Sequence, residues 1–245
     1  MKKRIFIVLI TAALFSAICF SQPAAIRVLV VTGGHDYNQS SFTEMFESMS
    51  GPISYKIVPF PEAFSMFTSQ KRNEFDVVVF YHMWQTITEE QKSNMIDCFW
   101  HGKPLVVLHH SICAFDKWNE YQRLIGGRYF RDTTIIEGRV FPPSTYEHDV
   151  YIPINVKDST NPVTREIADF ELFDEVYGGF YVERGVTTLL TTDHPDSSPM
   201  IGWSHYYGKS RVVTIQPGHD TPAFQSPVYR QLLRQAIEWA YRGKL

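Results

Sequence analysis

Histidines at the ends of predicted strands are the residues of this sequence best suited to chemistry. Lys103 to Cys113 reads KPLVVLHHSIC, and its apolar, partly β-branched run predicts a fully buried strand that stops at His109 and His110. If this strand is central and parallel, both histidines lie at its carboxyl end, where open α/β sheets place their ligands. Three further predicted strands also lead into a histidine, namely His35, His82 and His219. One such histidine could be an ordinary loop residue, but their recurrence favours a shared site.

The polar residues at these strand ends and in a second acidic segment are expected to converge on one crevice. They are His35, Asp36, His82, His109, His110, Asp174, Glu175, Tyr177, His219 and Asp220. One hypothesis is metal-free acid–base catalysis, because an imidazole with an unperturbed pKa of about 6.5 transfers protons at physiological pH. His109 and His219 are the predicted pair, and Asp220 or Glu175 would orient them or share the proton transfer.

A divalent metal, such as zinc, is the second hypothesis. Imidazoles and carboxylates from separate loops can bind zinc and leave one position open for water. The candidate ligands are His35, His109 and His219. No HxxxH or HExxH spacing accompanies them, so each ligand would have to come from a different loop.

Aromatic residues near the same strand ends could bind a sugar. Trp84, Trp118, Tyr177 and Trp203 could stack on the apolar face of a sugar ring, although at least half of these side chains are expected in the core. The residues predicted to bind substrate are His35, Asp36, His82, Trp84, His110 and Tyr177. A non-catalytic carbohydrate-binding module and a protein-interaction domain stay open as alternatives to an enzyme.

Strands and helices are predicted to alternate in the first half of the chain. Strands are expected at 26–32, 53–60 and 75–81, before the strand that ends at His109. Helices are expected from Ser40 or Ser41 to Met49, as a short turn over 61–70, and after a capping box at Thr88–Gln91. This alternation predicts an open, mostly parallel sheet flanked by helices, with right-handed crossovers.

The second half is predicted to be richer in strands, as an insertion packed over the strand ends. Strands are expected at 134–141, 149–156, 187–192, 200–207 and 210–216, and helices at 118–125, 162–168 and after Ser226. Gly208-Lys209 is predicted to form a two-residue hairpin turn. No linker or internal repeat divides the chain, so residues 22–245 are expected to form a single domain.

The first 21 residues resemble a signal peptide. Lys2, Lys3 and Arg4 precede an uncharged apolar run, and Ser21 suits the cleavage point. The mature protein is therefore expected to be exported to the periplasm or outside the cell, with no membrane contact after cleavage. The net charge of −3 and the absence of long charge runs argue against a nucleic-acid partner. Cys98 and Cys113 are expected to be buried free thiols.

The strand-end segments together resemble the trehalose-utilisation (ThuA-like) family over about residues 27–241. The matching segments are Gly33 to Asp36, Val107 to His109, Trp118 to Phe130, Asp174 to Tyr177, and Tyr207 to Asp220. The resemblance implies a class I glutamine-amidotransferase-like, or flavodoxin-like, fold. It also implies a small carbohydrate as the partner, such as an oxidised 3-keto glycoside, and a sugar-active hydrolase, lyase or isomerase as the enzyme class.

The sequence also departs from this family. Family members often carry His-Pro-Ile-Thr where this chain has Asn161 to Thr164, a histidine where it has Arg131-Asp132, and glycine at Ser210. Glutamine amidotransferases place a nucleophilic cysteine at the strand end that His109 occupies here, whereas Cys113 lies four residues further on. Because a nucleophile needs a positioned base and an exposed turn, amidotransferase activity is not expected.

Overall fold

Parallel strands form one half of the sheet, and His35, His82, His109 and His219 lie at or after the carboxyl ends of four of them. The computed structural model describes residues 24–242 and places nine strands in one sheet, in the order β2-β1-β3-β4-β13-β12-β11-β8-β9. The parallel strands are β1 (Ile26–Gly33), β2 (Ile53–Pro59), β3 (Val77–His82), β4 (Leu105–Leu108) and β13 (Ser210–Ile215). β4 therefore has a parallel neighbour on each side, β3 and β13, and is an interior strand as the sequence predicts.

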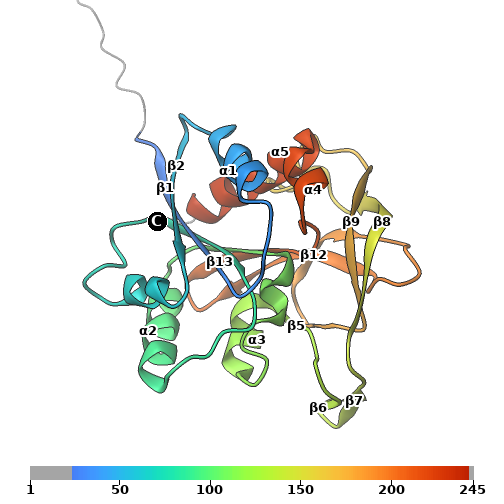
Figure 1. Cartoon of the computed structure of the whole chain (residues 1–245), viewed down its shortest axis with the longest axis horizontal. Coiled ribbons are helices and arrows are strands. Elements are labelled where there is room, and N and C mark those ends of the chain that lie inside the picture. The colour runs from blue at the N-terminus through green and yellow to red at the C-terminus, as the bar shows by residue number, and fades with distance from the viewer. Residues whose placement is uncertain (1–23, 243–245) are drawn as a thin grey trace, which may run out of the picture.

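Helices cover both faces of the parallel strands (Figure 1). α1 (Gln39–Glu47), α4 (Thr221–Gln225) and α5 (Pro227–Tyr241) cover one face, while the 3-10 helix η1 (Glu62–Phe67), α2 (Glu89–Trp100) and α3 (Asn119–Ile125) cover the other. Val28 and Val30 of β1 pack toward α1 and α5, and Leu29 and Val31 pack toward η1 and α2. This alternation buries both faces of the strand and explains its continuous apolar sequence.

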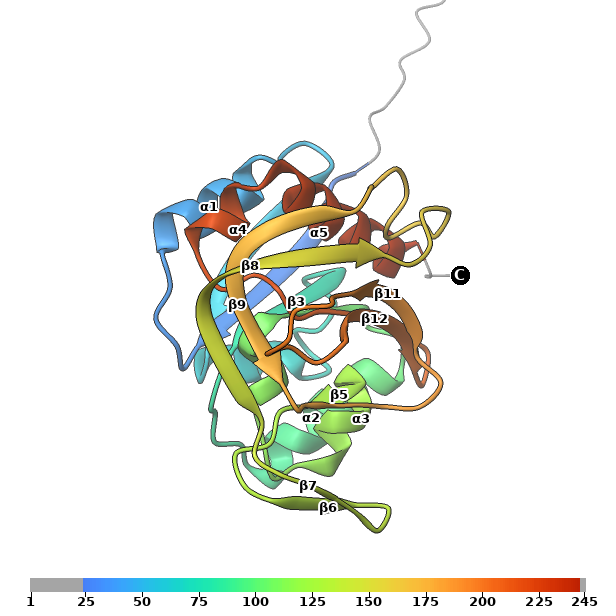
Figure 2. The ribbon, with the colours of Figure 1, turned by 90° about the vertical axis from the view of Figure 1, so that its right-hand side faces the viewer.

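Antiparallel strands extend the sheet beyond β13. They are β12 (Met200–Tyr207), β11 (Thr187–Thr191), β8 (Thr145–Val156) and β9 (Phe170–Gly178). Figure 2 shows β8 and β9 as a long curved ribbon at this end of the molecule. Two small ribbons, β5 (Gly127–Arg128) with β10 (Tyr181–Val182) and β6 (Thr134–Ile136) with β7 (Arg139–Phe141), complete the β-rich part. The fold is thus the predicted α/β sheet with a β-rich second half.

Local sequence signals explain several element boundaries. The Thr88 side chain accepts from Gln91 N–H and Gln91 reaches back to Thr88 N–H, so the capping box at the start of α2 is confirmed. Ser226 caps α5, and the turn at Gly208-Lys209 joins β12 to β13. Each of these signals depends on neighbouring residues alone, which is why the sequence predicts them well.

Three local predictions need correction. Asn38, rather than Ser40 or Ser41, caps α1 through a bond from Ser41 N–H. The expected strand over 134–141 is two strands joined by a turn at Glu137-Gly138, where both residues have positive φ. Residues 162–168 form turns instead of a helix, because Asn161 Oδ1 accepts from Val163 N–H and Glu166 adopts a φ of 59°.

The remaining chain-wide predictions concern export and the cysteines. The predicted signal peptide, residues 1–21, lies outside the described residues. Within residues 24–242, none of the helices has the length and apolar character needed to cross a membrane. Cys98 and Cys113 are buried free cysteines, as predicted.

Candidate functional site

A cavity of about 300 Å³ lies where the carboxyl ends of β1, β3 and β4 meet the β8–β9 ribbon. Its lining residues come from the segments after β1, β3 and β4, from the residue after the short strand at Gly127–Arg128, and from the ribbon itself: His35, Met83, Trp84, Cys113, Tyr129, Tyr146, His148, Glu175 and Tyr177. The strand pairing explains this convergence, because Gly33 of β1 lies beside His82 of β3. The cavity is therefore at the end of the sheet that the sequence predicts.

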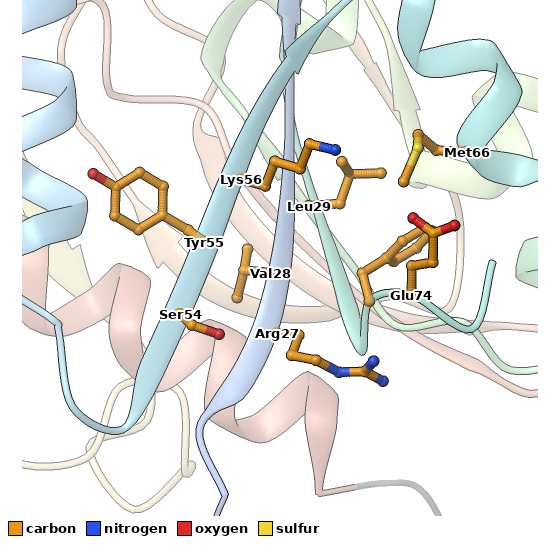
Figure 3. Close-up of a pocket in the computed structure, with 9 residues that line it drawn as sticks. Arg27, Val28, Leu29, Ser54, Tyr55, Lys56, Met66 and Glu74 are labelled. Carbon is orange, nitrogen blue, oxygen red and sulfur yellow. The ribbon is translucent and has the colours of Figure 1, made fainter. Parts of the chain in front are cut away.

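A second pocket lies at the opposite ends of the strands. Figure 3 shows it beside the amino-terminal halves of β1 and β2, lined by Arg27, Leu29, Lys56, Met66 and Glu74 among others. Its volume is about 210 Å³. The Arg27 guanidinium pairs with Asp76 through Nε–Oδ2 and Nη2–Oδ1 distances of 3.0 Å. This pocket gathers no histidines, so we place the candidate site at the other end.

Glu175 is the centre of the candidate site. Its Oε2 lies 2.8 Å from His109 Nε2 and 3.1 Å from His219 Nδ1, and these two nitrogens are 3.0 Å apart. Its other oxygen, Oε1, lies 3.3 Å from His148 Nε2. The Tyr177 hydroxyl is 3.0 Å from His109 Nε2, and its ring stacks on that imidazole. The predicted residues His109, Glu175, Tyr177 and His219 thus meet at one point.

The backbone holds His109 in an unusual conformation. His109 follows β4 directly and has a φ of 46°, a region that non-glycine residues rarely adopt. Its Nδ1 lies 2.8 Å from the carbonyl oxygen of Gln216, the residue after β13. Since a carbonyl only accepts, Nδ1 carries the proton and Nε2 faces Glu175. Parallel pairing of Leu108 with Ile215 brings these two strand ends together.

Asp174 positions the loop that carries His219. Its buried carboxylate accepts from the backbone N–H groups of Gly218 and His219. Burial raises the pKa of Asp174, while the nearby charge of His109 and these backbone hydrogen bonds act in the opposite direction. Asp174 and Glu175 are adjacent in β9, so one acts on the loop backbone and the other on the imidazoles.

Electrostatics couple Glu175 to the two histidines. Burial would raise the pKa of Glu175, but hydrogen bonds and positive charge from His109 and His219 outweigh it and lower this pKa. Burial likewise opposes the charged form of His219, but the hydrogen bond and charge of Glu175 raise its pKa. The carboxylate is therefore ionised and stabilises positive charge beside it.

His148 is a site residue that the sequence analysis missed. Tyr146 of β8 pairs with Tyr177 of β9, and Val150 pairs with Asp174, so the register shifts between them. His148 lies in this bulge, which turns its ring toward His219 at a centroid distance of 4.9 Å. Its side chain is 47% exposed. Asp149 in this bulge has a positive φ, but no pattern in the sequence predicts the bulge.

The remaining predicted histidines, His35, His82 and His110, form a second group that makes no ion pair with a carboxylate within residues 24–242. His82 is surrounded by the rings of Phe60, Phe80 and Phe115, and burial lowers its pKa to about 3. His110 is fully buried, its pKa is lowered by burial, and His35 stacks on it at a centroid distance of 4.4 Å. Of these three, His35 lines the cavity.

The other predicted residues separate into cavity and non-cavity positions. Trp84 and Tyr177 line the cavity, and the Arg131 guanidinium lies 4.6 Å from the Trp84 ring. Trp203 is buried in the core, and Trp118 packs on Phe115 and Tyr121. Asp36 is exposed, and the Asp220 carboxylate accepts from Thr221 instead of contacting His219 or His109 in the described structure.

Comparison with solved structures defines the class of fold. A putative ThuA-like protein from Parabacteroides merdae aligns with a TM-score of 0.75 and 21% identity, over 91% of this chain and 92% of that one. A putative ThuA-like protein from Bacteroides uniformis gives a TM-score of 0.68 and 18% identity, over 90% and 93% of the two chains. A glutamine amidotransferase from Thermotoga maritima gives 0.52 and 11%, over 89% and 99%. The chain is therefore an α/β protein with a glutamine-amidotransferase-like fold.

A family model identifies the chain more closely. The model described as trehalose utilisation, ThuA, matches residues 27–240. The chain belongs to this family, which associates it with carbohydrate utilisation. A search of curated proteins finds no match.

Proposed function

We propose that this protein is an enzyme of carbohydrate utilisation that moves a proton on an oxidised sugar, such as a 3-keto glycoside. The observation that carries the proposal is the buried Glu175 carboxylate, which has two histidines on one oxygen and the half-exposed His148 on the other. Because Glu175 and His148 both line the cavity, the charge and the proton acceptor are presented to a bound molecule.

His148 is the proposed proton acceptor. A ketone acidifies the neighbouring C–H, so the His148 imidazole takes that proton while the electron pair moves onto the carbonyl oxygen as an enolate. The ionised Glu175, 3.3 Å away, stabilises the imidazolium that forms. Return of the proton to the former carbonyl carbon, while the hydroxyl on the deprotonated carbon passes its proton to the former carbonyl oxygen, moves the ketone by one carbon and gives isomerisation. Departure of a group, with its bonding electrons, from the carbon on the other side of the deprotonated one gives elimination. His109 and His219 keep Glu175 ionised throughout.

The cavity walls suit a sugar ring. Trp84, Tyr129, Tyr146 and Tyr177 supply aromatic faces. The exposed Tyr146 supplies a hydroxyl as a polar edge, since the hydroxyls of Tyr129 and Tyr177 bond to Ser144 and His109. The volume of about 300 Å³ is at the lower end of the roughly 300–1,000 Å³ of ligand pockets. These dimensions support recognition of one sugar unit of a glycoside, with the rest of the molecule outside.

The state of Cys113 supports this chemistry over amide transfer. Burial holds the pKa of its thiol well above the usual range, so the thiol is protonated. His109 occupies the strand end instead, with its imidazole directed to Glu175. We further propose that the protein acts after export, on the basis of the signal-like residues 1–21.

Solvent deuterium measures the proposed step directly. The mature chain is incubated in D₂O with 3-keto-trehalose, and loss of the proton signals beside the ketone is followed by NMR. We expect exchange with the wild type, exchange slowed at least about tenfold in His148→Gln, and unchanged exchange in His101→Gln, whose imidazole is on the surface near Asp97.

Two outcomes would overturn the proposal. Binding of the keto sugar without exchange, measured by calorimetry, would identify a carbohydrate-binding protein. Exchange that is equally fast in His148→Gln and the wild type would show that another residue takes the proton.

A further inference from the structure

We propose that His109 Nε2, Glu175 Oε2 and His219 Nδ1 together bind one divalent first-row transition-metal ion. The three atoms come from three separate segments of the chain, which follow or belong to β4, β9 and β13. This inference depends only on the geometry of the three side chains. It holds whether or not the cavity accepts a keto sugar.

The spacing of the three atoms matches one face of an octahedron. They are separated by 2.8, 3.0 and 3.1 Å. Metal–ligand bonds of about 2.1 Å at right angles place neighbouring ligand atoms about 3.0 Å apart, whereas tetrahedral angles place them about 3.4 Å apart. Two imidazoles and one carboxylate on one face leave the remaining positions open, as in the facial sites of first-row metals.

The count of protons at this point favours a cation. The Gln216 carbonyl accepts from Nδ1–H of His109, so the imidazole meets its other neighbours through Nε2. Nε2 lies 2.8 Å from a carboxylate oxygen and 3.0 Å from a second imidazole nitrogen. The contact between His109 and Glu175 therefore needs positive charge, supplied either by a second proton on His109 or by a metal ion among the three atoms. A metal ion satisfies all three atoms together.

The surrounding contacts hold the ligands as metal sites do. Metal-binding histidines usually donate their second ring N–H to a carbonyl or carboxylate, which fixes the tautomer, and Gln216 does this for His109. Asp174 fixes the backbone of His219, and Gln216 Nε2 donates to the carbonyl of Glu175. All three ligands are thus oriented before any ion arrives.

The donor set also selects the kind of ion. Imidazole nitrogens suit zinc, iron and similar metals, whereas calcium and magnesium prefer oxygen ligands throughout. Glu175 and Tyr177 line the cavity, so an ion held here would lie beside a bound molecule and could polarise its carbonyl or bind water.

Metal binding tests the inference without reference to activity. The protein, expressed without a histidine tag, is stripped with a chelator, dialysed, and titrated separately with Zn²⁺, Mn²⁺ and Mg²⁺ by calorimetry. Bound metal is then counted by elemental analysis. We expect close to one Zn²⁺ or Mn²⁺ per chain, binding at least tenfold weaker in Glu175→Gln and His219→Ala, and no comparable binding of Mg²⁺.

Matched controls separate this site from adventitious binding. His101→Ala removes an exposed imidazole that contacts Asp97 and should leave affinity and stoichiometry unchanged. Far-ultraviolet circular dichroism checks that each variant folds. His219 is partly exposed, so its alanine variant keeps the test valid if Glu175→Gln is unstable.

The inference is overturned if the wild type binds no Zn²⁺ or Mn²⁺, or if both site variants bind them as tightly as His101→Ala does. Deuterium exchange in the chelator-stripped protein distinguishes the two proposals. Exchange in the metal-free protein would support the proposed proton transfer, and the measured metal content would still decide whether His109, Glu175 and His219 bind an ion. One bound metal per chain without any exchange would support the metal site and not the proton transfer.

Discussion

Two groups of histidines lie within the same end of this sheet, and they differ in one respect. His109, His148 and His219 surround the Glu175 carboxylate, and the pKa of His219 is raised. His82 and His110 are buried among rings, and their pKa values are lowered. The buried Glu175 carboxylate thus favours the charged form of His219, whereas burial without such a contact favours the neutral form of His82 and His110.

Removing the charge of Glu175 should abolish the difference in pKa between the two groups of histidines. It should also have the largest effect on deuterium exchange. In Glu175→Gln we expect deuterium exchange on the keto sugar to fall at least about tenfold, as in His148→Gln, because the His148 imidazolium loses its stabilising charge. Glu171→Gln, an exposed position on the same strand, is the matched control. If Glu175→Gln exchanges within threefold of the wild-type rate, a group other than Glu175 stabilises the charge that forms in the reaction.

Asp174→Asn tests whether Asp174 holds the loop that carries His219. The variant keeps one acceptor oxygen but loses the charge that holds the N–H groups of Gly218 and His219. We expect the free energy of unfolding to fall by about 1–3 kcal/mol, measured by urea denaturation. Asp132→Asn, on the exposed surface, should change it little. Equal stability of the two variants would contradict the positioning role of Asp174.

His82→Phe tests whether His82 is buried as a neutral imidazole, through the pH dependence of the free energy of unfolding. The folded-state pKa of about 3 lies below the unfolded value of about 6.5, so below pH 6.5 the unfolded chain binds a proton that the folded one does not. Stability contributed by neutral His82 is therefore lost as pH falls from 6.5 toward 3, by about 1.4 kcal/mol per pH unit. The variant should lose this slope, whereas His101→Phe should keep it. Parallel unfolding curves for both variants would show that His82 is not buried as a neutral group.

Tyr177→Phe should give the smallest effect. It keeps the ring that stacks on His109 and removes the hydroxyl 3.0 Å from Nε2. The expected change in the free energy of unfolding is about 1 kcal/mol, with exchange slowed less than tenfold. A loss as large as that of Glu175→Gln would make the hydroxyl, and not only the carboxylate, part of the reacting group.

The sequence predicted the parallel half well because its signals are local. Apolar runs, the capping box at Thr88 and the Ser226 cap depend on neighbouring residues, and they fix strand and helix identity. The convergence of His109, Glu175 and His219 followed from a general property of parallel sheets together with the family resemblance.

The site residues that escaped prediction depend on distant pairing. His148 enters the site through a bulge whose register is set by β9, and no pattern around residue 148 records that pairing. The neutral state of His82 depends on rings from three separate segments, at Phe60, Phe80 and Phe115. Asp220 was predicted as a partner because it follows His219 directly in the sequence. In the structure Asp174, 45 residues before His219, accepts from the His219 backbone N–H and holds the loop after β13.

The position of β13 also bears on how the protein acquires its fold during synthesis. β13 comes near the end of the chain but pairs with β4 in the middle of the sheet, through Val212–Leu105 to Ile215–Leu108. Until residues 210–215 have left the ribosome, the apolar β4 has no partner on that edge, and an unpaired strand edge invites aggregation. A chain cut short before β13 should therefore be insoluble, and assembly of the sheet must await nearly the whole polypeptide.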